Sequence, residues 1–289
     1  MGRPPASGRI RRRPSRPPRR PATEGQAARS ELTQRLLVAI PALIVLVVVV
    51  VQGGPLFAAV LAALGLVCLH ELFAMFENAR PTRLGAYVAL LGILAAAEYG
   101  THVNVMLAFA LAVPVVFLAA ISQARGAGAA SIAVSLLGVY WIGLGLAHGV
   151  LLRDLPHGDG VVIAVLIGTF VGDTAAYMGG RAFGRTRLAP RISPNKTVEG
   201  LLIGIALGTF SVWFTGIYQD WISGGQSLLL GLAVTIAAPL GDLFESHLKR
   251  DAGRKDTGRM FGAHGGALDR IDAVLFTAVA GYYVWHAML

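Results

Sequence analysis

Long blocks of apolar side chains recur along this sequence of 289 residues. The block Leu36–Val51, for example, runs for sixteen residues with one proline and no charged side chain. Because about 20 helical residues cross the roughly 30 Å hydrocarbon core of a bilayer, such blocks suffice once they are extended slightly at each end. Only 14% of the residues are charged, whereas a soluble domain has about a quarter. The number of apolar blocks excludes an ordinary soluble core and predicts an integral membrane protein.

Nine segments are predicted to cross the membrane as helices, which indicates an all-α polytopic membrane protein. They lie near residues 35–52, 55–76, 84–100, 102–121, 129–151, 160–180, 199–219, 226–245 and 268–288. The third and fourth are separated by only a few residues around Gly100–Asn104, so seven spans are the alternative. We divide the chain into a tail (1–30), N-terminal transmembrane helices (31–155) and a C-terminal transmembrane catalytic region (156–289).

The tail contains nine arginines among many prolines and hardly any large apolar side chain. This composition predicts disorder, and such a tail beside a membrane more often orients the protein or contacts anionic lipids than binds a specific partner. It lacks the interleaved aromatic residues and the folded module of a nucleic-acid binder, so we expect no nucleic-acid partner. The basic stretch is also too long for a cleaved signal peptide.

The distribution of lysine and arginine indicates an orientation, because positive charge collects in cytoplasmic loops. With nine spans and the N-terminus in the cytoplasm, 24 of the 25 basic residues lie on the cytoplasmic side, and Arg153 is the exception. We therefore expect a multi-pass protein of the inner (plasma) membrane with its C-terminus outside. The two longest loops, residues 181–198 and 246–267, then face the cytoplasm, where nucleotides and phosphorylated metabolites are available.

A charge at the centre of a membrane helix costs about 2.5–3.5 kcal/mol on insertion scales. Six acidic residues in or near the spans therefore need an explanation: Glu71, Glu98, Asp173, Asp242, Glu245 and Asp269. For Glu98 we expect an interfacial position, and for Glu71 a structural pair with a basic residue. Asp173 has two interpretations that stay open: a buried carboxylate paired with an arginine of the next loop, or a polar group beneath a phosphate or metal site.

Two pairs of carboxylates stand at neighbouring helix ends. Asp242 and Glu245 close the eighth span, and Asp269 and Asp272 open the ninth. Their i,i+3 spacing puts both members of a pair on one helical face, and a short connecting loop can bring the pairs to one point. Like charges held together need a neutralising cation, and Mg²⁺ favours one or two carboxylates plus substrate phosphates. Capping of the last helix, a contribution of up to about 1 kcal/mol, explains one of these aspartates but not four carboxylates.

The segment between the pairs is rich in cations and glycines. Its cations can neutralise a triphosphate, and its glycines let backbone amides approach a phosphate beside the N-terminus of the last helix. These residues are Lys249, Arg250, Arg254, Lys255, Arg259, Gly262, Gly265 and Gly266. The alternative is that these basic residues only determine the membrane topology, but that role needs neither carboxylates nor glycines. The combination is typical of phosphoryl or nucleotidyl transfer, where catalysis is mainly positioning and charge neutralisation.

This segment resembles the signature of phosphatidate cytidylyltransferases, also called CDP-diacylglycerol synthases. The matching positions are Ser246, Leu248-Lys249-Arg250, Lys255-Asp256, Gly258, Phe261-Gly262, His264-Gly265-Gly266 and Asp269-Arg270-Ile271-Asp272. Ala267 departs from the family pattern, which usually has a larger aliphatic residue there, and we expect this to affect packing at the helix start. The segments Gly172–Tyr177 and Ser193–Gly200 are also similar to the family, so the resemblance covers roughly residues 165–289.

The resemblance implies CTP and phosphatidic acid as substrates, a homodimer surrounded by membrane lipids, and Mg²⁺ held by Asp242 and Asp269. A second cation such as K⁺ stays open. Catalytic roles are implied for Asp269, Asp272, Lys249 and Lys255. The expected substrate-binding residues are Asp173, Ser193, Asn195, Lys196, Ser246, Arg250, Asp256, His264, Gly265 and Gly266.

Within this set, Lys196 and Arg250 are expected to hold the lipid phosphate, and Lys249 and Lys255 the triphosphate. Asp272 or Asp256 is expected to orient a lysine or the second cation. For His264, a contact with substrate and a structural hydrogen bond within the loop are both open.

Two other functions compete with cytidylyl transfer. A CTP-dependent kinase of polyprenols or other lipids would transfer the γ-phosphate and release CDP. A membrane transporter would place its charges near the bilayer midplane, often with an internal repeat, whereas here the charges cluster at one face and no repeat is apparent.

Overall fold

The computed structural model describes residues 41, 43–123, 128–258 and 265–289. The Arg/Pro-rich tail, Arg259, Gly262 and His264 lie outside the described residues. The chain divides between Val45 and Leu46, and the arrangement reported below is that of Leu46–Leu289.

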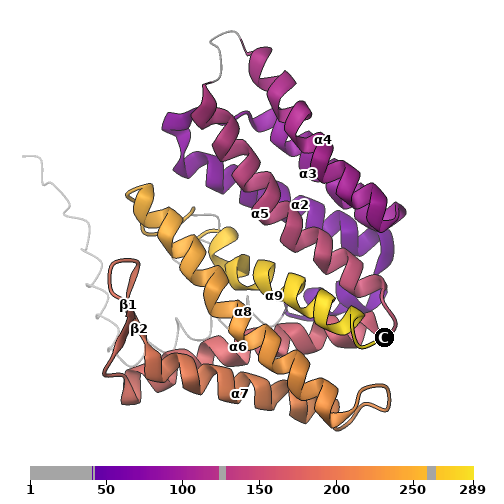
Figure 1. The fold of residues 1–289 in the computed structure, drawn as a ribbon, viewed down its shortest axis with the longest axis vertical. Helices are drawn as coiled ribbons and strands as arrows, with labels where there is room; N and C mark the ends of the chain where they lie inside the picture. Colours follow the sequence, from indigo (N-terminus) through magenta and orange to yellow (C-terminus); the bar gives the residue numbers. More distant parts are fainter. Residues whose placement is uncertain (1–40, 42, 124–127, 259–264) are drawn as a thin grey trace, which may run out of the picture. The chain divides into compact units, whose positions relative to one another are not determined.

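Helices follow one another along almost the whole of this unit (Figure 1). A helix over Leu43–Gln52 is followed by α2 (Gly54–Met75), η1 (Glu77–Ala79), α3 (Arg83–Tyr99), α4 (His102–Ile121), α5 (Ala129–Asp154), α6 (Gly158–Phe183), β1 (Arg187–Ala189), β2 (Ser193–Thr197), α7 (Val198–Gly216), α8 (Gly224–Asp251) and α9 (Leu268–His286). Each predicted span from the second to the ninth coincides with one of these helices, and the first is described as a helix over Leu43–Gln52. The third and fourth are two separate helices, with the capping box of Thr101 and Asn104 beginning α4.

Six of the described helices are long and apolar enough to cross a membrane: α2, α4, α5, α6, α7 and α8. Over their described residues, the other predicted spans do not meet this length and composition. Helix α3 has 17 residues, and α9 carries Asp269, Arg270 and Asp272 in its first turns. The helix before α2 is described over Leu43–Gln52. The polytopic all-α character is confirmed.

The two long polar loops are shorter than predicted. Residues 187–197 form an antiparallel hairpin of β1 and β2, in which Arg187 pairs with Thr197. Helix α8 continues six residues beyond Glu245 to Asp251, so Ser246, Lys249 and Arg250 are helical and not part of a loop. Lysine and arginine in a last turn interact favourably with the helix dipole, and the helix is succeeded by Gly253 at φ +65°, a conformation that favours glycine.

Helices pack closely where glycine removes the side chain. A Cβ at Gly145 of α5 would lie 2.7 Å from Leu275 Cα of α9, and one at Gly204 of α7 would lie 2.7 Å from the Gly172 carbonyl oxygen of α6. Such small-residue contacts are the usual packing of membrane helices, whose association gains little from the hydrophobic effect. These two contacts hold α5 against α9 and α6 against α7.

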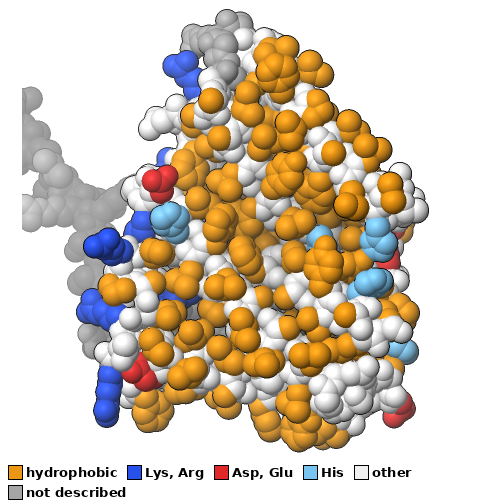
Figure 2. Space-filling view, viewed as in Figure 1, with side chains coloured by type: hydrophobic (Ala, Val, Ile, Leu, Met, Phe, Trp, Pro, Cys, Tyr) orange, Lys and Arg blue, Asp and Glu red, His pale blue; other side chains and the backbone are white. Residues whose placement is uncertain are grey.

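Charged side chains gather at the margins of an otherwise apolar surface. Figure 2 shows hydrophobic side chains over most of one face, with basic residues along one edge. Exposed Ile236 and Leu240 of α8 belong to the apolar surface. The basic exception, Arg153, donates from Nε to the Val50 carbonyl (2.6 Å) and from Nη2 to the Val51 carbonyl (2.9 Å). It therefore satisfies the last carbonyls of the helix that precedes α2.

Candidate active site

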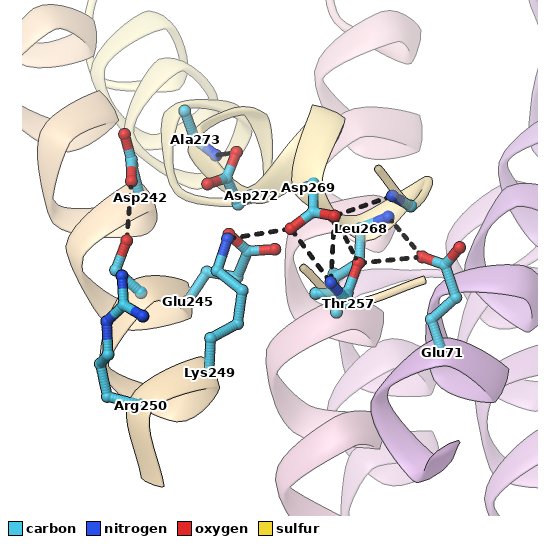
Figure 3. A network of polar contacts seen from close by, with 12 residues as sticks. Glu71, Asp242, Glu245, Lys249, Arg250, Thr257, Leu268, Asp269, Asp272 and Ala273 are labelled. Carbon is cyan, nitrogen blue, oxygen red and sulfur yellow. Dashed lines mark hydrogen bonds and ion pairs between the residues drawn. The ribbon is translucent and has the colours of Figure 1, made fainter. Parts of the chain in front are cut away.

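The end of α8 and the start of α9 meet at Gly241. A Cβ there would lie 3.0 Å from Ala273 Cα and closer still to the Asp272 carbonyl oxygen. Because only a glycine allows this approach, the carboxylate pair Asp242 and Glu245 faces the pair Asp269 and Asp272. The predicted convergence of the two pairs is present (Figure 3).

Asp269 is surrounded by donors. Its Oδ1 accepts from Lys249 Nζ (2.9 Å), and its Oδ2 accepts from the Gly266 N–H (2.8 Å), the Thr257 N–H (3.1 Å) and the Thr257 hydroxyl (2.9 Å). A carboxylate offers about four acceptor positions, so these donors fix its orientation. They also keep its charge stabilised beside the helix N-terminus.

Lys249 is the cation at the centre of the carboxylates. Its Nζ lies 2.5 Å from Glu245 Oε2, an i,i+4 pair within α8, in addition to the Asp269 contact. Glu245 is 1% exposed, and its Oε1 has no hydrogen-bond partner among the described residues. Asp272 is buried too, accepts from the Ala273 N–H (2.8 Å), and lies near enough to Glu245 and Asp242 for their charges to interact.

Asp242 connects this centre to the β1–β2 hairpin. Lys196 Nζ of β2 lies 2.6 Å from Asp242 Oδ2, and the Ser246 hydroxyl donates to Asp242 Oδ1 (3.2 Å). Arg250 Nε donates to the Ile192 carbonyl (3.2 Å), which fastens the hairpin to the end of α8. One side of α8 thus meets the hairpin, while Glu245 and Lys249 meet α9.

A cleft of about 510 Å³ opens beside the Lys196–Asp242 ion pair. Asp173 and Arg181 of α6 and Asn195 of β2 line it together with that pair. Its other walls are apolar or small, among them Leu201, Ile205, Ala238 and Pro239. Of the two interpretations of Asp173, the polar group in a site agrees with this position; no ion pair of Asp173 with an arginine is present among the described residues.

The remaining predicted site residues lie on the hairpin and in the segment between α8 and α9. Ser193 is partly exposed on β2, and Lys255 and Asp256 are exposed in the turn after α8. Gly265 adopts φ +82°. The Gly266 N–H, expected to face a phosphate, donates to Asp269, because Asp269 lies in the first turn of α9 and faces back to it. The prediction for His264 falls outside the described residues.

Two residues of the network were not predicted as site residues. Glu71 of α2 is 6% exposed and accepts from the Ala267 N–H (3.0 Å) and the Leu268 N–H (2.9 Å). Thr257, 1% exposed, lies between Glu71 and Asp269. Among the described residues the partners of Glu71 are these donors and not the expected basic residue. In the sequence, the position of Glu71 within an apolar block could have indicated a site residue. Nothing in the sequence around Thr257 did so.

Comparison with known proteins decides the family. The sequence model of the cytidylyltransferase family matches residues 33–288. The chain belongs to the cytidylyltransferase family. A phosphatidate cytidylyltransferase of Synechocystis sp. is 33% identical over 284 residues, covering 87% of this chain and 95% of the relative. One of Mycobacterium tuberculosis is 30% identical over 288 residues, covering 91% and 85%. The resemblance stated from the sequence motifs is confirmed, and the chain is a nucleotidyltransferase.

Cytidylyltransferases of this class use CTP and generally need a divalent cation. The described residues contain no group of three or more His, Cys, Asp or Glu side chains placed to hold a metal ion. The donor chemistry nevertheless fits such a cation, because Mg²⁺ takes only one or two protein carboxylates and completes its shell with phosphate and water oxygens. Asp242 and Asp269, the two expected ligands, supply hard oxygens together with Glu245 and Asp272. Glu245 Oε1 is buried without a donor among the described residues.

Proposed function

We propose that this cytidylyltransferase transfers the cytidylyl group of CTP to phosphatidic acid, releasing CDP-diacylglycerol and pyrophosphate. One observation carries the proposal: the Lys196–Asp242 ion pair (2.6 Å) joins a half-apolar cleft to a cluster of carboxylates around one lysine. A lipid phosphate suits the cleft, and a nucleotide triphosphate with its cation suits the cluster. The names of the Synechocystis and Mycobacterium relatives agree with this pair of substrates.

The cleft has an apolar part and a charged part, which suit the two parts of a phospholipid. Leu201, Ile205 and Pro239 offer an apolar surface to the glycerol and upper acyl region. Lys196 and Arg181 offer positive charge at its polar part, where the lipid phosphate lies. A phospholipid entering sideways from the membrane keeps its acyl chains in the bilayer throughout, so only the head group leaves the lipid phase.

The reaction needs little proton transfer. An oxygen of the lipid phosphate, already an anion, attacks the α-phosphorus of CTP; the bond from that phosphorus to the β-phosphate oxygen breaks, and pyrophosphate leaves with the electron pair. Lys249 and Lys255 neutralise the triphosphate, while Lys196 holds the attacking phosphate. Positioning and charge neutralisation of this kind account for most of the catalysis of phosphoryl transfer.

Two lysines neutralise three carboxylates of the site. Lys196 neutralises Asp242, and Lys249 neutralises Glu245 and Asp269. On substrate binding, each lysine exchanges a carboxylate for a phosphate. We propose that Asp242 and Asp269 would hold Mg²⁺, which would neutralise the triphosphate and polarise its P–O bonds. Asp272 and Glu245 keep Lys249 oriented.

We further propose an inner-membrane homodimer whose active site faces the cytoplasm. The basic residues support this orientation, because positive charge collects in cytoplasmic loops and the hairpin and the end of α8 carry Lys196, Lys249 and Arg250. A cytoplasmic active site also agrees with the availability of CTP in the cytoplasm. The homodimer rests on the family resemblance and is tested by the mass of the purified protein in detergent.

Membranes containing the protein, given CTP labelled in the cytidine, phosphatidic acid and Mg²⁺, test the function. CDP-lipid is expected, and Asp242→Asn is expected to lose at least about 100-fold of the rate, since one oxyanion-type electrostatic contact already contributes that much. Asp220→Asn, an exposed acid in the turn before α8, is the matched control and should retain the rate. Failure of wild-type membranes to form CDP-lipid, or full activity of Asp242→Asn, contradicts the proposal.

A further inference from the structure

Glu71 holds the start of α9 from a distant part of the chain. It lies on α2, 197 positions before Leu268, and its carboxylate accepts the N–H groups of Ala267 and Leu268 (3.0 and 2.9 Å). Ala267, the N-cap residue of α9, makes no side-chain capping hydrogen bond of its own. The first amides of a helix require acceptors, and a negative charge there also interacts favourably with the helix dipole. Glu71 is thus a cap supplied by another helix.

The surrounding chain leaves room for this carboxylate and little else. A Cβ at Gly258 would lie 2.8 Å from Glu71 Cδ, and a Cβ at Gly266 would lie 2.7 Å from the same atom. Two glycines of the signature segment therefore pack directly on Glu71. These two glycines therefore make room for the Glu71 carboxylate, in addition to any role in the approach of a phosphate.

Glu71 is connected to the reacting centre through Thr257. The Thr257 hydroxyl lies 3.3 Å from Glu71 Oε2 and 2.9 Å from Asp269 Oδ2, and the Thr257 N–H donates to Asp269 as well. Figure 3 shows Glu71, Thr257 and Asp269 in this sequence, with Lys249 beyond them. The same carboxylate thus fixes Leu268 and contacts Thr257, residues on both sides of Asp269.

We propose that Glu71 is a positioning residue of the cytidylyl transfer: its charged carboxylate sets the place of Asp269 through the α9 N-terminus and Thr257. The inference rests on the proposed function. If Glu71 has this role, a residue of the N-terminal half of the chain helps to position the active site, although the signature segment lies wholly in the C-terminal half. Both carboxylate oxygens matter, because Oε1 and Oε2 each accept one backbone N–H, and a glutamine at this position would replace one of these acceptors with an N–H donor.

The test compares Glu71→Gln with Glu98→Gln as purified proteins. Glu98 is the matched control: it is another glutamate of the N-terminal helices, with a buried Oε2 lacking a described partner, and no hydrogen bond or ion pair joins it to the described part of the signature segment. Each protein is assayed for CDP-lipid formation from CTP, phosphatidic acid and Mg²⁺, per mole of protein that elutes as folded. Hydrogen–deuterium exchange is measured over residues 257–269 without substrate or metal.

For Glu71→Gln we expect kcat to fall about 10- to 100-fold, the loss of one or two hydrogen bonds to a charged group. The KM for phosphatidic acid should stay within about two-fold, because the lipid cleft does not touch Glu71. Amides of residues 257–269 should exchange at least about ten-fold faster. Glu71→Asp, which keeps the charge, should recover part of kcat. Glu98→Gln should match the wild type in all three measurements.

A lowered unfolding temperature with unchanged kcat per folded molecule would show a structural role only and overturn the inference. So would unchanged exchange over residues 257–269. If Glu71→Gln does not fold, Glu71→Asp decides: kcat and exchange equal to those of the wild type overturn the inference. A wild-type enzyme that makes no CDP-lipid counts against the proposed function instead, and the exchange measurement still tests the contact.

Discussion

Replacing Gly241 by alanine tests how closely α8 and α9 must approach for activity. The added Cβ would lie 3.0 Å from Ala273 Cα and closer to the Asp272 carbonyl oxygen. Both neighbours are backbone atoms and cannot swing away as a side chain could. Ordinary contact between carbon atoms is about 3.5–4.0 Å, so the first turns of α9 must move from α8 by about 0.5–1 Å.

The magnitude follows from two opposing terms. Overpacking costs about 1–3 kcal/mol, while alanine in place of glycine within a helix gains about 1 kcal/mol. A net destabilisation of about 1 kcal/mol is expected, which leaves the protein folded. The activity should suffer more, because the displacement lies between Asp242 and Asp272, and a misplacement of about 1 Å can cost 100-fold in rate.

The assay is the rate of CDP-lipid formation by purified Gly241→Ala in detergent micelles containing phosphatidic acid, with the unfolding temperature measured in parallel. We expect a rate 10- to 100-fold below that of the wild type. Gly225→Ala is the matched control, because a Cβ at Gly225, in the first turn of the same helix, has no atom within 4 Å. It should keep the wild-type rate. A Gly241→Ala enzyme with wild-type rate and stability would refute the close approach of the two helices.

Three further predictions concern Lys249, Arg153 and the divalent cation. Lys249→Met leaves Glu245 and Asp269 without their cation, so it should lose activity and about 3 kcal/mol of stability, read as a lower unfolding temperature; a stable protein would contradict the pairing. Arg153→Met removes two hydrogen bonds to the Val50 and Val51 carbonyls and should cost about 2 kcal/mol while kcat stays within two-fold, because Trp285 and Pro156 place this region at the other end of α9; a large loss of kcat would show that this region bears on the site. Removal of divalent cations by EDTA should abolish CDP-lipid formation and excess Mg²⁺ should restore it, whereas activity that persists in EDTA would exclude the proposed metal role.

The fold was predictable where apolar composition decides it. The long apolar blocks predicted α2 to α9 within a few residues, except for the C-terminal end of α8. The separation of α3 from α4 was the open point, and the capping box of Thr101 and Asn104 settles it. The extension of α8 to Asp251 was missed, because a polar segment after an apolar block was read as a loop. The i,i+4 pair of Glu245 and Lys249 was the local signal for a continuing helix.

The site was predictable where neighbours in sequence are neighbours in space. The i,i+3 carboxylate pairs led to Asp242, Glu245, Asp269 and Asp272. Contacts that cross the chain were not predictable in this way: Lys196 meets Asp242 across 46 positions, and Glu71 meets Leu268 across 197. Tertiary packing determines both contacts, and a single sequence does not reveal which distant residue will supply the partner.

The fate of the CTP phosphates tests the central claim most directly. Wild-type enzyme reconstituted with phosphatidic acid and Mg²⁺ is given CTP carrying one label on the α-phosphorus and a second on the γ-phosphorus. Cytidylyl transfer at the junction of Asp242, Lys196 and Asp269 predicts the α-label in the lipid and the γ-label in pyrophosphate, in equal amounts. The γ-label in the lipid, with CDP as the second product, would contradict the account.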